Sequence, residues 1–391
     1  MNKTTLALSL AASLFLSPAF ADNNDRNTAS IPRFDHVFLI MMENHSYGQI
    51  IGDSVNAPYI NQLANSANLA TNYMGVGHPS LTNYLEVVGG SNFGIENDNS
   101  PNWHNATPSP SLIDPIAGSG MDLATPAVDT TNNGTPAAPI YNVPFDAAPY
   151  VARTIADQLA DANMSWKTYQ ESLPASGTVD QVNYSDGIYS NLSPADIVNS
   201  GNVQKLYAVK HNPFVYFENI QQNADPKNGL GNVVDFEGIN GLYADLRSDD
   251  VPNFLFIAPN QCHDMHGVGN GSAFCAYDPN PPTQMNPTLI QMGDATVKQL
   301  VMAIKSSEAW KHGKNALIVM WDENDYSSNP NQVAMIVDTN YGVHGVKTNK
   351  PYNHFSLLKT LESGFGLDCL NHACDKNVQV MSDMFSTRPA R

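Results

Sequence analysis

Two short apolar runs, one near each end of the chain, stop abruptly at acidic and amide side chains. The run at 38–42 is followed by Glu43 and Asn44, and the run at 317–321 is followed by Asp322 and Glu323. Continuous apolar runs of this length are typical of strands that are buried on both faces of a parallel sheet. In open α/β sheets the functional crevice lies beyond the carboxyl ends of the strands, so we expect these four residues to share one site.

Helices and apolar strands alternate along most of the chain, which favours an α/β fold with a mostly parallel central sheet and helices on both faces. Strands are expected at 35–42, 69–74, 165–169, 253–258, 316–321 and 333–337, and an extended segment at 214–217. Helices are expected at 57–67, 81–88, 154–162, 203–209, 293–306 and 355–363. The stretch 91–149 is rich in Asn, Pro, Gly, Ser and Thr and lacks periodicity. It is therefore expected to be an irregular insertion in a single domain of residues 22–391.

The first residues have the pattern of an export signal. Lys3 precedes an apolar stretch at 6–16, and 17–21 has the small residues of a cleavage site, which predicts a signal peptide at 1–21 and a secreted or periplasmic protein. No later run approaches the roughly 20 apolar residues of a transmembrane helix. The four cysteines are an even set, and their clustering predicts disulfides 262–275 and 369–374, with a zinc site as the alternative.

The charge balance bears on the partner. Acidic residues number 37 against 19 basic ones. Nucleic acid is not expected as a partner, because its binding requires basic patches. An acidic protein that binds phosphate would have to neutralise it locally, by a metal ion or by backbone N–H groups. The alternative is that the charge only keeps the protein soluble.

Further candidate metal ligands follow a third strand and lie in a late loop; they are Asn260, His263, Asp264, His266, His344 and His354. Carboxylate, amide and imidazole groups together suit Zn²⁺ first, with Mn²⁺, Fe²⁺ or Ca²⁺ as alternatives. Each group alone has a structural explanation, such as a helix cap, a solvated turn or a surface histidine. Together in one crevice they would repel or desolvate one another without a cation.

Ser80 follows a glycine-rich turn and stands where the helix expected at 81–88 begins. Metal coordination would lower the pKa of its hydroxyl group, and the helix N-terminus offers N–H donors to phosphoryl oxygens. The alternative is that Ser80 is only a helix cap. The chain has no Gly-x-Ser-x-Gly motif, so the common serine-hydrolase arrangement is not expected.

Five motifs stand in order along the chain. They are Met42-Glu-Asn-His-Ser-Tyr47, Gly77-His-Pro-Ser80-Leu-Thr-Asn-Tyr84, Lys210-His-Asn-Pro-Phe-Val-Tyr216, Trp321-Asp-Glu323 and Tyr352-Asn-His-Phe-Ser-Leu-Leu-Lys-Thr-Leu-Glu362. In this order they resemble the motifs of the phosphoesterase family of secreted bacterial phospholipases C and acid phosphatases. The resemblance implies an alkaline-phosphatase-like three-layer fold. It also implies that Glu43 and Asn44 are one metal-binding pair, Asp322 and Glu323 the other, and Ser80 the residue that becomes phosphorylated. Thr82 departs from the proline that many relatives have there.

The resemblance also implies roles for histidines. His266 is similar to the His of the family's Asn-Asp-Gly-His segment, here Cys262-His-Asp-Met-His266, with His263 as an additional ligand candidate. His354 matches the His that opens the last helix, and His344 lies in a glycine-flanked loop. For His78 we expect a phosphate-contacting or supporting role. No role is expected for six others, namely His36, His45, His104, His211, His312 and His372.

These expectations lead to a metal-dependent phosphoesterase that works through a phosphoserine at Ser80. A phospholipase C acting on phospholipids such as phosphatidylcholine is preferred, with the lipid under the insertion near Phe93, Trp103 and Tyr141, and transient contact with a lipid surface. The alternatives are an acid phosphatase acting on small phosphomonoesters and a non-catalytic anion-binding protein. Histidines charged at mildly acid pH would favour an acid optimum. The sequence does not give the oligomeric state.

Overall fold

The computed structural model describes residues 31–106, 109–121, 149–173, 206–267, 275, 287–326 and 330–387. Its strands are β1 (His36–Met42), β2 (Asn68–Met74), β3 (Ser119–Met121), β4 (Pro149–Val151), β5 (Trp166–Gln170), β6 (Val233–Val234), β7 (Phe254–Ala258), β8 (Asn315–Trp321), β9 (Gln332–Thr339), β10 (Lys347–Thr348) and β11 (Tyr352–Asn353). A nine-stranded sheet has the order β10-β2-β9-β8-β1-β7-β5-β6, with β11 also paired with β2, and β3 and β4 form a separate pair.

The large sheet is mostly parallel, as expected. β1 pairs in parallel with both β7 and β8, and β5 pairs in parallel with β6 and β7. β9 runs antiparallel to β2 and β8. The residues of β8 are all buried, and so are those of β1 after His36, because helices cover both faces of the sheet.

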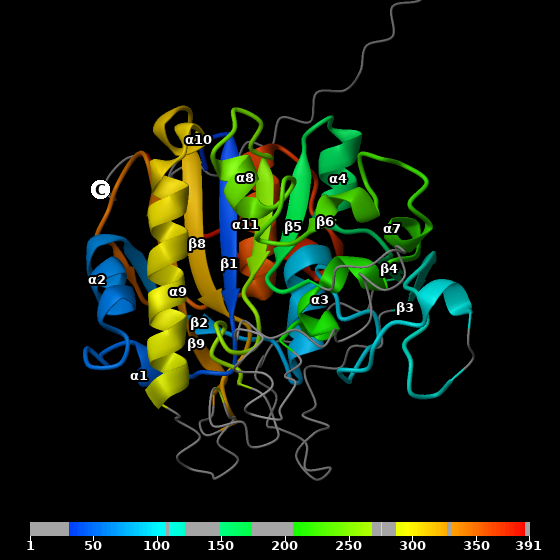
Figure 1. Ribbon diagram of the computed structural model, residues 1–391, viewed down its shortest axis with the longest axis horizontal. Coiled ribbons are helices and arrows are strands. Elements are labelled where there is room, and N and C mark those ends of the chain that lie inside the picture. Colours follow the sequence, from blue (N-terminus) through cyan, green and yellow to red (C-terminus); the bar gives the residue numbers. More distant parts are fainter. Residues whose placement is uncertain are drawn as a thin grey trace, which may run out of the picture.

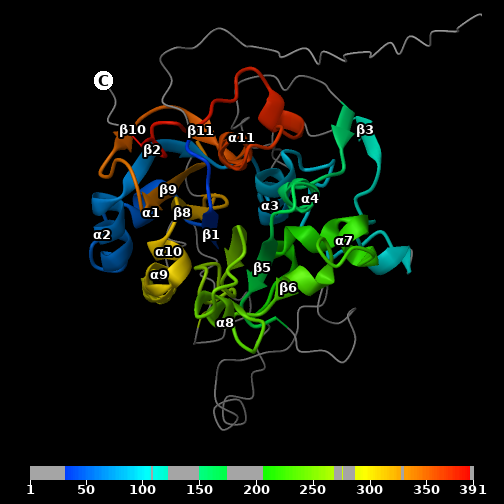
Figure 2. The same ribbon diagram turned by 90° about the horizontal axis from the view of Figure 1, so that it is seen from above.

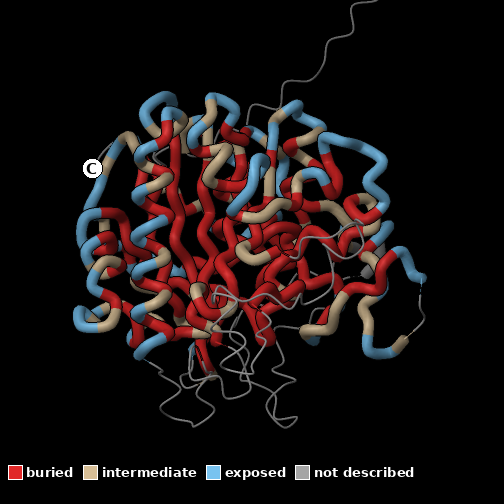
Figure 3. Tube along the Cα trace, viewed as in Figure 1, coloured by how far each residue is buried: buried red, intermediate tan, exposed pale blue. Residues whose placement is uncertain are grey.

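The helices are α1 (Tyr47–Ile50), α2 (Pro58–Ser66), α3 (Ser80–Gly89), α4 (Ile155–Asp161), α7 (Glu218–Gln222), α8 (Leu242–Leu246), α9 (Pro287–Ser306), α10 (Glu308–Lys311) and α11 (His354–Phe365). Helices α8, α9 and α10 cover one face of the sheet, and α3, α4 and α11 cover the other (Figures 1 and 2). The buried chain follows the sheet, and the exposed chain lies on the outer helices and the turns (Figure 3). The three-layer α/β expectation is therefore confirmed.

The extended conformation expected at 214–217 is wrong. The apolar run at 214–217 lies mostly in a 3-10 helix, Pro213–Tyr216, that packs against α3. Pro213 stands at its first position, where the missing N–H costs nothing, and a buried four-residue apolar run does not by itself distinguish a strand from a helical turn. The helix expected at 203–209 is absent from the described residues 206–209. Residues 206–208 are irregular, and a 3-10 turn begins at Val209. Residues 203–205 lie outside the described part.

The described part of the expected insertion packs into the main core. Phe93, Trp103 and Ile116 belong to the same apolar cluster as the sheet. Phe93 packs edge-on against Phe217, with ring centroids 5.2 Å apart. Phe93 and Trp103 therefore support packing rather than the expected contact with lipid. Tyr141 and the expected signal peptide lie outside the described residues.

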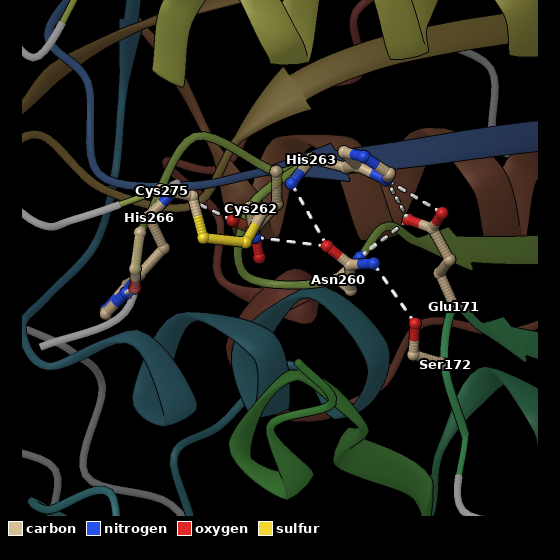
Figure 4. The surroundings of a disulfide bond; sticks show 9 residues. Glu171, Ser172, Asn260, Cys262, His263, His266 and Cys275 are labelled. Atoms are coloured by element: carbon tan, nitrogen blue, oxygen red, sulfur yellow. Dashed lines mark hydrogen bonds and ion pairs between the residues drawn. A yellow bond between two sulfur atoms is a disulfide. The ribbon is translucent and has the colours of Figure 1, made fainter. Parts of the chain in front are cut away.

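Both expected disulfides are present. Cys262 is bonded to Cys275, and Cys369 to Cys374. The first disulfide anchors the loop that follows β7 and carries His263 and His266 (Figure 4). The zinc alternative for the cysteines is therefore wrong. Within the ranges described above, no helix is long and apolar enough to cross a bilayer.

Glu362 in α11 gives a first testable prediction. Its side chain is 1% exposed, Oε1 accepts a hydrogen bond from the Leu370 N–H at 2.8 Å, and burial raises its pKa from about 4.5 to about 9. The folded state thus keeps a proton that the unfolded chain releases, so this group lowers stability as pH rises from 4.5 to 9. At about 1.36 kcal/mol per pKa unit, the loss between pH 4.5 and 7 is on the order of 3 kcal/mol.

Glu362→Gln should remove this loss, because the amide is neutral at every pH in that window. Denaturant unfolding at pH 5, 7 and 8.5 measures the free energy of unfolding. We expect that of the variant to increase relative to that of the wild type as pH rises. Glu308→Gln, on an exposed side chain of α10, is the matched control and should leave the pH profile unchanged. Parallel pH profiles for Glu362→Gln and the wild type would show that Glu362 is ionised in the fold.

Candidate active site at the carboxyl ends of the central strands

The carboxyl ends of three adjacent strands bring distant residues together. Met42 pairs with Trp321 across β1 and β8, so Glu43 and Asp322 leave the sheet side by side. The Asn44 N–H donates to Asp322 Oδ1 at 3.2 Å. The Glu43 N–H donates at 2.8 Å to the backbone oxygen of Asp264, in the loop after β7. The two apolar runs therefore end side by side, as expected from the sequence.

Ser80 lies among these carboxylates. It is the first residue of α3 and is 1% exposed, and the residue before it, Pro79, is the N-cap. Ser80 Oγ lies 3.0 Å from Glu43 Oε2 and 3.4 Å from Glu323 Oε1, within hydrogen-bonding reach of both. Its side chain therefore faces the carboxylates rather than capping the helix. This placement suits a nucleophile that an adjacent base or cation activates.

The turn before Ser80 is held by Asn83. Asn83 Oδ1 accepts from the N–H groups of Val76 at 3.0 Å and Gly77 at 2.9 Å. Its Nδ2 donates to Gly77 O at 2.8 Å and Glu323 Oε2 at 3.0 Å. Thr82, which departs from the family pattern, uses its N–H and its hydroxyl to bond Pro79 O at 3.1 and 2.8 Å. The threonine thus helps to close the first turn of α3.

His78 holds one of the carboxylates. Its Nδ1 lies 3.0 Å from Glu323 Oε2, and its ring stacks on Tyr326 with centroids 3.9 Å apart. The imidazole is almost fully buried. In this arrangement His78 supports Glu323, one of the two roles expected for it.

His211, for which the sequence predicted no role, bridges two carboxyl groups. Its Nε2 lies 3.1 Å from Glu43 Oε1, and its Nδ1 lies 3.1 Å from Asp264 Oδ2. The ring stacks on Tyr84, nearly parallel to it, and is 2% exposed. Sequence reasoning missed His211 because it lies in the 3-10 turn Val209–His211 and not at a strand end. Its place in the Lys210-His-Asn-Pro motif was the available signal.

Burial shifts the pKa values at this bridge in opposite directions. It raises the pKa of Glu43 to about 7 and that of Asp264 well above its usual range, and it lowers that of His211. A neutral imidazole has one N–H and one acceptor nitrogen. The shifts therefore favour a neutral imidazole at His211 over an imidazolium.

Lys210 brings a cation next to Ser80. Its Nζ lies 3.4 Å from Ser80 Oγ, 3.0 Å from Asp98 Oδ2 and 3.3 Å from His266 Nε2. Burial alone would lower the pKa of Lys210, but the charges of Asp98 and Glu43 outweigh it and raise that pKa. Lys210 is therefore a fixed positive charge. Neither Lys210 nor Asp98 was predicted as a site residue.

The four histidines expected as metal ligands have other partners. His354 uses both ring nitrogens, one 2.6 Å from the backbone oxygen of Asp322 and one 3.0 Å from the hydroxyl of Tyr73. His266 Nδ1 lies 2.7 Å from Gly267 O, and its Nε2 faces Lys210. His263 Nδ1 lies 2.8 Å from both carboxylate oxygens of Glu171 (Figure 4). His344, 44% exposed, lies 3.5 Å from Asp338 Oδ1.

The expected charging of histidines at mildly acid pH is not supported at this site. Burial lowers the pKa of His266 to about 3 and that of His354 to about 4. Both imidazoles are therefore neutral at pH 5 to 6. An acid optimum would need another cause than the charging of His266 and His354.

The oxygen atoms of the site suit a divalent cation better than its histidines do. Asn44 Oδ1 and Asp322 Oδ2 are buried, and neither has a hydrogen-bond partner among the described residues. Burial and the charges of Glu43 and Glu323 raise the pKa of Asp322 well above its usual range, which marks a group that a cation would stabilise. In the same described ranges, no three His, Cys, Asp or Glu side chains are already arranged around one metal position. The donor chemistry thus fits a metal, although the carboxylates now contact Ser80, His78 and His211.

Residues 53–368 match the Phosphoesterase family, and the chain belongs to that family. Among its relatives, a probable acid phosphatase of Kluyveromyces lactis is 24% identical over 349 residues, which cover 88% of this chain and 62% of the relative. A phosphatidylinositol-3-phosphatase of Mycobacterium tuberculosis is 25% identical over 370 residues, which cover 93% and 88% of the two chains. The chain spans 63% of a phosphate-repressible acid phosphatase of Penicillium chrysogenum, at 24% identity.

A solved structure from Vibrio parahaemolyticus, described as a protein in the alkaline phosphatase superfamily, also matches. Its TM-score is 0.45 and its identity 13%, and the match covers 88% of this chain and 69% of the other.

Proposed function

We propose that this protein is a phosphatase that cleaves phosphate monoesters through a phosphoserine at Ser80. The observation that carries the proposal is the position of Ser80 Oγ, buried at the start of α3 between Glu43 Oε2 and Lys210 Nζ. Membership of the Phosphoesterase family supports the reaction class. Relatives named acid phosphatase and phosphatidylinositol-3-phosphatase support a monoester as the substrate.

The chain's own residues supply most of the chemistry. Ser80 Oγ attacks phosphorus while its proton passes to Glu43. The bond from phosphorus to the ester oxygen breaks, and that oxygen takes the proton from Glu43 and leaves as the alcohol. Lys210 and the Leu81 N–H at the start of α3 bind phosphoryl oxygens as negative charge spreads over them. Water then attacks the phosphoserine, which releases phosphate and restores the Ser80 hydroxyl. His78 and Asn83 hold Glu323 in place throughout.

We place a divalent metal ion in the same proposal, held by Glu43, Asn44, Asp322 and Glu323 with the Ser80 oxygen. When bound, it would lower the pKa of the Ser80 hydroxyl group and stabilise charge on the phosphoryl group. The unpartnered oxygens of Asn44 and Asp322 support this ligand set. Zinc is the first choice of metal, although ligation mostly by oxygen widens the choice to manganese or calcium.

The phospholipase C alternative has less support than the sequence suggested. It relied on aromatic residues of the insertion as lipid contacts, but Phe93 and Trp103 are packed in the core. The relative that acts on a lipid is named a phosphatase. Phosphatidylcholine therefore serves as the comparison substrate.

Activity of the purified chain on p-nitrophenyl phosphate and on phosphatidylcholine, before and after chelation, tests the proposal. We expect hydrolysis of the monoester, little release of phosphocholine, loss of activity with chelator, and recovery on adding back one divalent cation. Metal content measured in parallel identifies the ion. A matched chain kept in buffer without chelator controls for slow inactivation.

Each contrary result has a distinct meaning. Faster cleavage of phosphatidylcholine than of the monoester would overturn the substrate class. Full activity after metal removal, with no metal in the sample, would overturn the metal ligands and leave Ser80 and its neighbours in place. No activity on either substrate, with metal bound, would support a non-catalytic anion-binding protein.

A further inference from the structure

Asp98 places a carboxylate between the start of α3 and the cation beside Ser80. Its Oδ1 accepts a hydrogen bond from the Leu81 N–H at 3.0 Å, and its Oδ2 accepts one from Lys210 Nζ at 3.0 Å. Leu81 follows Ser80 directly, and the same Nζ lies 3.4 Å from Ser80 Oγ. Asp98 thus takes two donors that adjoin the serine hydroxyl.

These donors are the kind that a phosphoryl group needs. A helix N-terminus with a free N–H and a nearby lysine together bind the oxygens of a phosphate. A carboxylate accepts the same hydrogen bonds in the same geometry but carries one negative charge rather than two. Asp98 therefore resembles a bound anion that the chain itself provides.

We infer that Asp98 is an internal competitor for the phosphoryl group, and that substrate or phosphate must displace its carboxylate from Leu81 N–H and Lys210. This inference rests on the proposed function, because it assigns the phosphoryl oxygens to that end of α3. Asp98 is 31% exposed, so its side chain can turn into water when it is displaced. Lys210, only 16% exposed, stays in place to meet the incoming anion.

Displacement has a consequence for affinity. A site that is open only part of the time binds its ligand more weakly in proportion to the open fraction. A charge-assisted hydrogen bond contributes about 1.5–3 kcal/mol, so removing the charge of Asp98 should tighten phosphate binding by roughly tenfold or more. The alternative is that Asp98 only orients Lys210. Removing its charge would then weaken binding.

Calorimetric titration of inorganic phosphate into the full chain distinguishes a competing Asp98 from an Asp98 that only orients Lys210. Asp98→Asn keeps the shape and an acceptor for the Leu81 N–H but loses the charge, and we expect its Kd for phosphate to fall about tenfold. Glu237→Gln, an exposed position with the same change in net charge, should leave the Kd unchanged. Adding Lys210→Met to Asp98→Asn should abolish the gain, because the phosphate then lacks its cation.

An unchanged or higher Kd in Asp98→Asn would overturn the inference, and so would a gain that survives Lys210→Met. Turnover measured on the same samples keeps the two proposals apart. Normal wild-type turnover without tighter phosphate binding in Asp98→Asn would refute the competitor and leave the phosphatase standing. Tighter, Lys210-dependent binding in a protein that hydrolyses no ester would support the competitor and refute the phosphatase.

Discussion

Ser80→Ala is expected to lower turnover of p-nitrophenyl phosphate by at least about a thousandfold. The alanine has no oxygen to attack phosphorus, and no other hydroxyl group is shown within hydrogen-bonding distance of both Glu43 and Lys210 in the described residues. The fold should persist, because the side chain caps no helix. Steady-state kinetics and a thermal unfolding curve on the same preparation check both statements.

Two further measurements sharpen this test. Acid quenching of the wild type during turnover, followed by mass spectrometry, should locate a phosphate on the peptide that contains Ser80, and Ser80→Ala should show none. Thr82→Ser is the matched control, since it keeps the hydroxyl group that bonds Pro79 O at 2.8 Å. Near-normal turnover by Ser80→Ala would remove the serine from the mechanism.

His211→Ala should be the most destabilising single change at the site. The imidazole separates Glu43 from Asp264, with contacts of 3.1 Å to each, and fills the space beside Tyr84. Its removal leaves two buried carboxyl groups facing a cavity with no partner between them. Leaving a buried polar group without its partner costs about 1–3 kcal/mol, and the cavity adds to this cost.

Denaturant unfolding measures this loss of stability, and two further variants serve as comparisons. His312→Ala, 80% exposed on its side chain, should change the free energy of unfolding by less than about 0.5 kcal/mol. His211→Gln keeps a donor and an acceptor and should recover part of the loss. If His211→Ala were as stable as His312→Ala, the bridge would contribute nothing to the fold.

The strand-end residues could be predicted because a simple rule governs them. Apolar runs flanked by carboxylates predicted Glu43 and Asp322 in a common place, and the parallel pairing of β1 with β8 brings them there. Ser80 could be predicted because the residues around it, a glycine-rich turn followed by a helical pattern, indicate the start of a helix. Both disulfides followed from the clustering of the cysteines.

The remaining site residues lie in irregular segments of the chain. Such segments have no hydrophobic periodicity from which their structure could be predicted. His211 and Lys210 come from a 3-10 turn, and Asp98 comes from a coil segment. Their positions depend on packing against α3, which no local pattern encodes. His344, which the sequence predicted as a metal ligand, lies in the loop after β9, and its Nδ1 is 3.5 Å from Asp338 Oδ1. A ligand-type residue near a strand end still needs a side chain that points to the site.

The pairing of β1 determines when the central sheet can form as the chain is synthesised and folds. β1 is the first strand of the described chain, yet Val37 lies between Phe254 of β7 and Ala316 of β8, both of which are synthesised much later. Contacts so distant along the chain form slowly, because a long loop must close before they contribute. A growing chain therefore has no complete reaction centre until β8 has been made. A truncation before β8 keeps β7 but should leave one edge of β1 unpaired, so we expect the fragment to aggregate and to have no activity.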